Sequence, residues 1–90
     1  MKCVQLLIQG YVVGVGYRSW MKMKAETLHI VGWVKNREDN AVEAVVQGEG
    51  EQVKRMIELC KKGPEVAWVE KVEVTEKPVD NNLESFTVVY

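Results

Sequence analysis

Residues 10–18 read Gly-Tyr-Val-Val-Gly-Val-Gly-Tyr-Arg, so three glycines fall within seven positions and an arginine closes the run. The preceding stretch, 3–13, is rich in β-branched and aromatic side chains, which predicts a strand. Residues 19–29 contain helix formers with apolar side chains at helical spacing, and Ser19 is the expected N-cap. The chain is therefore expected to pass from a strand through a flexible glycine turn into the start of a helix.

The remaining segments predict a hairpin, a second helix and two more strands. The second helix is expected to end sharply, because two lysines, a glycine and a proline follow its apolar face. The hairpin turn falls at Asp39-Asn40, where Asn tolerates the left-handed conformation. The predicted bounds are 30–36 and 41–48 for the hairpin, 50–62 for the helix, and 67–76 and 84–90 for the last strands.

This order predicts the fold class, which is an α/β (α+β) sandwich. The sequence βαββαβ is the ferredoxin-like arrangement, here with an extra C-terminal edge strand. Right-handed crossovers place both helices on one face of a mixed, mainly antiparallel sheet. Ninety residues are the size of one domain, 1–90. The first strand is expected to be central, with the glycine loop at its C-terminal end, where α/β sheets favour ligands.

The composition excludes several classes of partner. The chain has 12 Lys and Arg against 13 Asp and Glu, a formal net charge of −1, which argues against nucleic acid as a partner. No segment approaches the roughly 20 apolar residues of a membrane helix, and no signal peptide is recognised. The two cysteines, Cys3 and Cys60, are expected to be reduced thiols in the cytoplasm, although a bridge between them stays open.

Metal-binding patterns are missing from the sequence. His29 is the only histidine, and it is expected at the end of the first helix rather than in a catalytic role. No cysteine–histidine cluster has zinc spacing, so no zinc site is expected. Glu38 and Asp39 are interpreted as solvated turn residues, with Mg²⁺ on a single carboxylate left open.

The glycine loop has the chemistry of an anion site. Glycines let successive N–H groups point at one anion, and the helix N-terminus adds partial positive charge. Arg18 can bind two phosphate oxygens through its planar guanidinium. The Walker pattern is excluded because Tyr17-Arg18 follows Gly16, and the dinucleotide fingerprint because Ser19 stands where it needs a glycine. A glycine-rich turn with a surface arginine remains an alternative of similar weight.

Asn36 is the second candidate, because it lies near the end of a predicted strand, just before the turn. Its amide both donates and accepts hydrogen bonds, which suits holding a water for attack. Taken alone, a turn-stabilising role is the better interpretation. The three tryptophans, Trp20, Trp33 and Trp68, are scattered over three different predicted elements. They are expected to pack in the core or on the sheet rather than to stack on nucleic-acid bases.

Taken together, these motifs resemble the acylphosphatase family. The family's first motif is roughly Gly-x-Val-Gln-Gly-Val-Gly-Phe/Tyr-Arg, which residues 10–18 follow. The second is Gly-Trp/Tyr-Val-x-Asn, a turn glycine and then Val-Glu, which residues 32–36 and 42–43 follow around the turn. Further likenesses are Gln47-Gly48, Gly63-Pro64 and the closing Phe86 to Tyr90. The match runs in order through nearly the whole chain.

The resemblance implies an enzyme that hydrolyses acyl phosphates to a carboxylate and inorganic phosphate by direct water attack, with no metal or other cofactor. It implies that Arg18 binds the phosphoryl group and that Asn36 positions the attacking water. The implied backbone cradle for the phosphate consists of Val13, Gly14, Val15, Gly16 and Tyr17. The expected partners are a small acyl phosphate and competing phosphate or sulfate, with no nucleic acid and no membrane, for a cytoplasmic monomer.

The sequence departs from the family pattern at three positions. Val13 replaces a glutamine, Asn40 replaces the turn glycine, and His29 replaces the usual glycine after the first helix. These changes are expected to affect rate and stability more than fold. They leave open a weakened relative that only binds anions or a partner protein. An RNA-binding sheet is a poorer alternative, because it needs a basic face and aromatics on the central strands.

Overall fold

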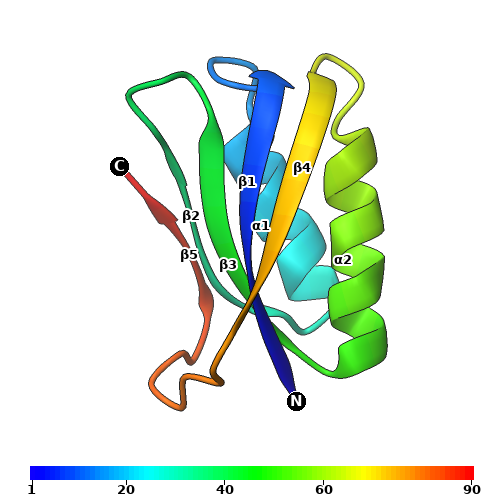
Figure 1. The fold of residues 1–90 in the computed structure, drawn as a ribbon, viewed down its shortest axis with the longest axis vertical. Coiled ribbons are helices and arrows are strands. Elements are labelled where there is room, and N and C mark those ends of the chain that lie inside the picture. The colour runs from blue at the N-terminus through cyan, green and yellow to red at the C-terminus, as the bar shows by residue number, and fades with distance from the viewer.

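The computed structural model describes residues 1–90 as five strands and two helices in the order β1-α1-β2-β3-α2-β4-β5 (Figure 1). The strands are β1 (Lys2–Tyr11), β2 (Val31–Asn36), β3 (Val42–Gly48), β4 (Trp68–Lys77) and β5 (Phe86–Val89), and the helices are α1 (Tyr17–Thr27) and α2 (Gly50–Lys62). The predicted element order is confirmed. The first strand ends at Tyr11 rather than at Val13, and α1 begins at Tyr17 rather than at residue 19, so the loop between them lies two residues earlier than expected and has the expected length.

The five strands form one sheet in the order β4-β1-β3-β2-β5. All neighbouring strands are antiparallel except β2 and β5, which pair in parallel. The predicted extra edge strand is therefore confirmed as β5. The first strand, β1, lies inside the sheet between β4 and β3, although β3 rather than β1 is the middle strand. Both helices lie on the same face of the sheet (Figure 1).

The hydrophobic core fills the space between the sheet and the two helices. Alternate side chains of a strand point to one face, and residues one turn apart share a helix face. The core side chains follow both periods, with strand positions two apart and helix positions three or four apart. They include Val4, Leu6 and Ile8 of β1, Val42, Ala44 and Val46 of β3, Met21 and Ala25 of α1, and Val53, Met56 and Cys60 of α2.

The pairing between β1 and β4 is irregular shortly before the glycine loop begins. The pairing of β1 with β4 shifts between Gln9 and Gly10. Gly10 has φ +136°, and a Cβ there would collide with the carbonyl oxygen of Trp68. Only glycine fits such a close approach between two backbones. The irregularity lies two residues before the end of β1, whose last residue, Tyr11, still pairs with Trp68.

The expectation that Ser19 caps the first helix is wrong. The helix begins two residues earlier, at Tyr17, and its N-cap is Gly16, with φ 79° and no side-chain cap hydrogen bond. A side chain on a left-handed N-cap would be strained, so a glycine occupies the position that a serine usually takes. Ser19 lies in the first turn of α1 and is exposed.

The expected packing of Trp68 is also wrong, because this side chain is 71% exposed. Trp68 opens the edge strand β4 and pairs with Tyr11, which is likewise exposed, just after this irregularity. The β4 side chains that pack against the core are Val69 and Val72. Trp20 packs against the core as expected, and Trp33 is half-buried on the sheet.

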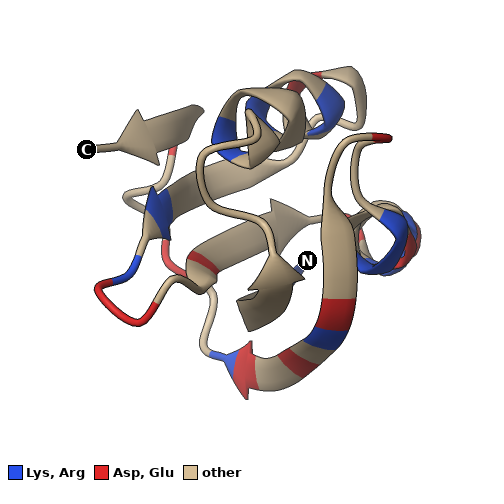
Figure 2. Cartoon of the chain, turned by 90° about the horizontal axis from the view of Figure 1, so that it is seen from above, with Lys and Arg blue, Asp and Glu red and all other residues tan.

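The cysteines are not bridged. Cys3 and Cys60 are both free and buried. Neither helix has the length and hydropathy to cross a membrane. Basic and acidic residues are interspersed over the helices, strands and turns rather than gathered by sign (Figure 2).

Candidate active site

The loop between β1 and α1 presents backbone N–H groups without partners. Gly14 and Gly16 both adopt left-handed conformations, with φ 81° and 79°. The first backbone bond of α1 runs from the Trp20 N–H to the Gly16 carbonyl, so no backbone carbonyl accepts from the N–H groups of residues 17–19. No acidic residue lies in the first turn of the helix. These free donors at the positive end of a helix suit an anion.

A small pocket of about 80 Å³ opens at this helix start. It joins the two residues that the sequence singled out, Arg18 and Asn36, although they belong to different elements. Water has a share of about 30 Å³ in the liquid, so the pocket suits one compact group such as a phosphoryl group. Its lining residues are Val12, Gly14, Gly16, Tyr17, Arg18, Ser19, Asn36 and Tyr90.

Part of the predicted cradle turns away from the pocket. Gly14, Gly16 and Tyr17 line it, whereas Val13 and Val15 do not. The side chains of Val13 and Val15 are partly buried against the hydrophobic core. These two valines therefore hold the loop against the fold, and the glycines between them face the pocket.

Arg18 is the second residue of α1 and is half-buried. Its Nη1 donates to the carbonyl oxygen of Val89 at 3.2 Å, and its guanidinium carbon lies 4.7 Å from the centroid of the Tyr90 ring. No carboxylate forms an ion pair with Arg18. A guanidinium has five N–H donors, so most of them stay free for an anion.

Asn36 is the last residue of β2. It lies two positions after Val34, which is fully buried against the helices, so its side chain points to the helix face of the sheet. Its amide makes no hydrogen bond within the protein. Asn36 thus reaches the start of α1 with a free donor and a free acceptor.

The turn that follows Asn36 is held by other groups. The Arg37 N–H donates to the Ala41 carbonyl at 2.8 Å. The Asp39 Oδ1 accepts from the Ala41 N–H at 3.3 Å and from the Arg37 Nε at 3.2 Å. The turn-stabilising role that the sequence favoured for Asn36 therefore falls to Asp39.

Tyr17 anchors the start of α1 to the second helix. Its side chain is 1% exposed, and its hydroxyl donates to the Cys60 carbonyl at 2.6 Å. Burial raises the pKa of the Tyr17 hydroxyl far above its usual value and raises the pKa of the Cys60 thiol to about 12. Both groups stay neutral at physiological pH, so they support the site and take no part in proton transfer.

Tyr90 is a pocket residue that reasoning on site chemistry missed. The parallel register places Lys35 beside Val89, so Asn36 and Tyr90 follow at the same end of the two strands. The sequence predicts a last strand there, but it does not give the neighbour or the register of that strand. The only indication was the likeness of Phe86 to Tyr90 to a family pattern.

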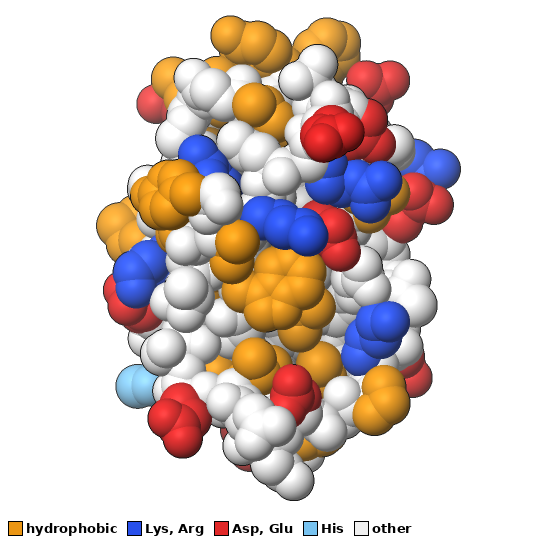
Figure 3. Space-filling view, turned by 90° about the vertical axis from the view of Figure 1, so that its left-hand side faces the viewer, with side chains coloured by type: hydrophobic (Ala, Val, Ile, Leu, Met, Phe, Trp, Pro, Cys, Tyr) orange, Lys and Arg blue, Asp and Glu red, His pale blue; other side chains and the backbone are white.

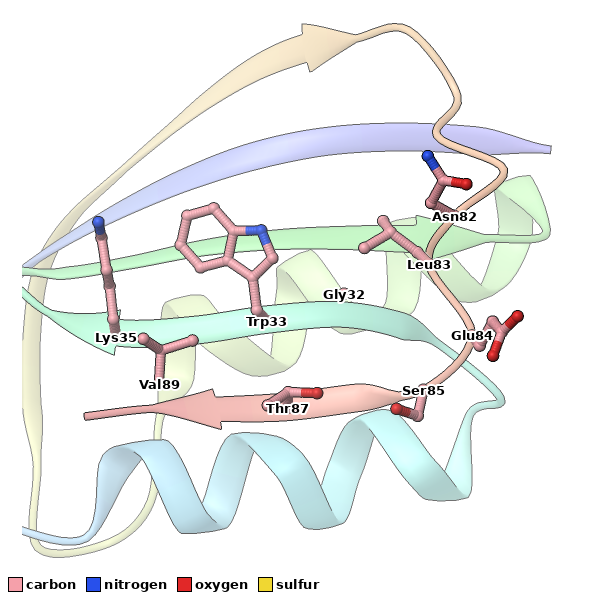
Figure 4. A pocket seen from close by; sticks show the side chains of 9 residues that line it. All are labelled: Gly32, Trp33, Lys35, Asn82, Leu83, Glu84, Ser85, Thr87 and Val89. Atoms are coloured by element: carbon pink, nitrogen blue, oxygen red, sulfur yellow. The ribbon is translucent and has the colours of Figure 1, made fainter.

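A larger hollow of about 560 Å³ lies on the open face of the sheet. Its walls come from β2, β5 and the loop before β5, and Figure 4 shows Trp33, Lys35 and Val89 among them. Figure 3 shows hydrophobic side chains at the centre of this side of the molecule, with basic and acidic side chains around them. This hollow contains neither Arg18 nor the helix N-terminus, so the smaller pocket is the better anion site despite its size.

Metal ligands are not assembled anywhere in the fold, because no group of three or more His, Cys, Asp or Glu side chains is placed to hold a metal ion. The pocket residues themselves offer one guanidinium, one amide, three hydroxyl groups and backbone N–H groups. Hydrogen-bond donors and a fixed positive charge suit an oxyanion rather than a cation.

Known proteins resemble this chain over nearly its full length. The sequence matches the model of the Acylphosphatase family over residues 4–88. It is 48% identical to the acylphosphatase of Acaryochloris marina over 75 residues, which are 83% of this chain and 81% of that one. It is 38% identical to the acylphosphatase of Methylococcus capsulatus, over 99% and 97% of the two chains. The fold is similar to the crystal structure of acylphosphatase from Bacillus subtilis, with a TM-score of 0.95, 32% identity and complete coverage of both chains.

Proposed function

The chain belongs to the acylphosphatase family and hydrolyses acyl phosphates, and we propose that the reaction takes place in the pocket lined by Arg18 and Asn36. The observation that carries the proposal is the meeting of three features in one small pocket. These are a guanidinium without an ion pair, an amide without a hydrogen bond, and the free N–H groups at the start of α1. Each has a role in phosphoryl transfer.

The phosphoryl group is bound by the loop and by Arg18. The N–H groups of residues 17–19 donate to its oxygens, and the helix start adds positive charge. Arg18 donates two parallel hydrogen bonds through the edge of its guanidinium, which stays open beside the contact with Val89. These contacts hold the charged oxygens in substrate, transition state and product.

Hydrolysis of an acyl phosphate needs few catalytic groups besides those that bind the phosphoryl group. An acyl phosphate releases a carboxylate, which departs without a proton donor, and a loose transition state makes small demands on a base. Asn36 accepts a hydrogen bond from the attacking water and orients it toward phosphorus. Positioning and charge stabilisation then lower the barrier, and no histidine or metal is required. The same site would be poor at hydrolysing a stable phosphate ester.

We also propose a monomeric, cytoplasmic enzyme that consists of one acylphosphatase-like domain, 1–90. Every residue that lines the pocket comes from one chain, so catalysis needs no second copy. The free thiols of Cys3 and Cys60 fit a reducing compartment. The acyl part of the substrate extends from the pocket into solvent, which is compatible with small acyl phosphates of several kinds.

Two variants separate the proposed roles. Arg18→Ala removes two charge-assisted hydrogen bonds of about 1.5–3 kcal/mol each, so it should abolish both phosphate binding and turnover of benzoyl phosphate. Asn36→Ala should lower kcat by roughly 10²- to 10³-fold, because one preorganised polar group is lost in the transition state. Phosphate should still bind the Asn36 variant nearly as well as the original protein.

The measurements are phosphate affinity by calorimetry and kcat for both variants, with circular dichroism as a check of folding. Arg37→Ala is the matched control, because Arg37 lies beside Asn36 but outside the small pocket. A folded Asn36→Ala protein with unchanged kcat would remove the water-positioning role. Retained phosphate binding in Arg18→Ala would place the anion site elsewhere.

A further inference from the structure

Two groups at the end of the chain hold the Arg18 side chain from different directions. The Val89 carbonyl accepts a hydrogen bond from Nη1 at 3.2 Å. The Tyr90 ring lies against the guanidinium, 4.7 Å from its central carbon to the ring centroid, which is within the range of cation–π attraction. Tyr90 itself also lines the small pocket.

These contacts use parts of the guanidinium that an anion does not need. A cation–π contact places the guanidinium over the ring face and uses up no N–H donor, whereas phosphate is bound through the N–H groups in the plane of the guanidinium. The carbonyl of Val89 occupies one N–H of five. The ring and the carbonyl therefore contact Arg18 from two sides and leave four of its five N–H donors without a partner in the protein.

We propose that Tyr90 is a positioning residue for Arg18, in the pocket to which the proposed function assigns phosphate binding. The parallel pairing of β2 and β5 supports this role. The pairing runs to Lys35 beside Val89, so Tyr90 follows β5 just as Asn36 ends β2. The register of one strand pair thus sets the position of both the amide and the ring that holds the guanidinium.

A second contact between the same elements provides a control. Lys22 lies one helical turn after Arg18, and its Nζ donates to the Phe86 carbonyl at 3.1 Å. Helix α1 is thus attached to β5 at two points, but Lys22 does not line the small pocket. Removal of the Lys22 contact weakens the attachment of β5 without touching the plane of Arg18.

The experiment compares Tyr90→Leu, Tyr90→Phe and Lys22→Met with the original protein. Tyr90→Leu should weaken the binding of inorganic phosphate by about two- to five-fold, the size of an exposed cation–π contact. KM for benzoyl phosphate should rise by a similar factor with a smaller change in kcat, because Arg18 holds the phosphoryl group in ground and transition states alike. Tyr90→Phe keeps the ring and should restore phosphate affinity relative to Tyr90→Leu.

Lys22→Met should lower the free energy of unfolding and leave phosphate affinity unchanged. Unchanged affinity in Tyr90→Leu would overturn the proposal. So would an equal loss in Lys22→Met, which would show that only the attachment of β5 matters, or an equal loss in Tyr90→Phe, which would assign the effect to the hydroxyl. Calorimetry with phosphate needs no turnover, and Arg18→Ala measured beside these variants reports separately on whether the pocket is the anion site.

Discussion

His29 and Asn40 are the two residues other than glycine with left-handed backbone, at φ 56° and 64°. Both stand where the acylphosphatase pattern has glycine, the residue that adopts this conformation most readily. A side chain with a Cβ is strained there, and Asn tolerates the conformation better than His. The two departures therefore cost stability at positions outside the small pocket.

We predict that His29→Gly raises the free energy of unfolding by roughly 0.5–1 kcal/mol, because glycine relieves the strain of the left-handed position after α1. Asn40→Gly should raise it by less, since Asn already accepts this conformation. Urea denaturation of the two variants beside the original protein measures the difference. Phosphate affinity and kcat should not change, because α1 meets the pocket at its opposite end. A destabilised His29→Gly protein would refute the strain argument.

At the scale of the element, the start of α1 is the part of the fold on which the site depends. Gly16 caps the helix in a left-handed conformation, and a Cβ there would meet no atom within 4 Å. Space is thus available, and only the backbone angle demands glycine. Gly50, the first residue of α2, has similar open space but no left-handed angle.

We predict that Gly16→Ala lowers the free energy of unfolding by roughly 1–2 kcal/mol, the cost of a left-handed residue with a Cβ. It should also weaken phosphate binding, because the N–H groups of residues 17–19 change direction when the cap relaxes. Gly50→Ala is the matched control and should leave phosphate affinity unchanged. Calorimetry measures the phosphate affinity of both variants, and denaturation measures their free energies of unfolding. Equal phosphate affinity in the two variants would contradict a role for the cap.

The elements also show how much of the fold could be predicted from the sequence. The bounds of α2 were predicted correctly because a local pattern marks both its apolar face and its end at Gly63. The cap of α1 was predicted wrongly because a serine is a usual N-cap residue. The left-handed backbone of Gly16, which makes it the N-cap instead, cannot be read from the residue type alone. The exposure of Trp68 was not predicted, because the register of β4 beside β1, with its irregularity at Gly10, is a property of two paired strands.

The same division applies to the candidate site. The loop, Arg18 and Asn36 carry recognisable chemistry in the sequence, and the structure brings them into one pocket. The contribution of Val89 and Tyr90 depends on the register of β5 beside β2, which joins segments that are far apart in the chain. Nothing local specifies such a register, so the side chain that lies against Arg18 was not predicted.

At the scale of the whole molecule, no cluster of metal ligands is present and no Asp or Glu lines the small pocket. We predict that hydrolysis of benzoyl phosphate is unchanged by excess EDTA. The assay is a rate measurement after dialysis against the chelator, with and without added Mg²⁺ or Zn²⁺. A large loss of rate that either ion restores would contradict the mechanism without a metal.

The net charge of the chain is −1, so attraction of an anion depends on the local positive charge of the pocket. We predict that inorganic phosphate and sulfate compete with benzoyl phosphate, because both fit the same donors around Arg18. Inhibition should weaken with added NaCl, since the Debye length falls to about 10 Å at 0.1 M salt and the partly exposed guanidinium is screened. Steady-state kinetics at two salt concentrations measure this. Non-competitive inhibition would indicate an anion site outside the pocket.

The strand order β4-β1-β3-β2-β5 shapes the way in which the chain reaches its folded state. Cys3 pairs with Lys77, so β1 gains one of its two neighbours only after most of the chain has been brought back toward its beginning. Closing such long loops lowers the conformational entropy of the chain before the stabilising contacts between the strands form. Folding is therefore expected to be slower than in a helical bundle of equal length. Until β4 arrives, β1 presents an unpaired edge to other chains, so crowded refolding is the condition in which this small protein is most exposed to aggregation.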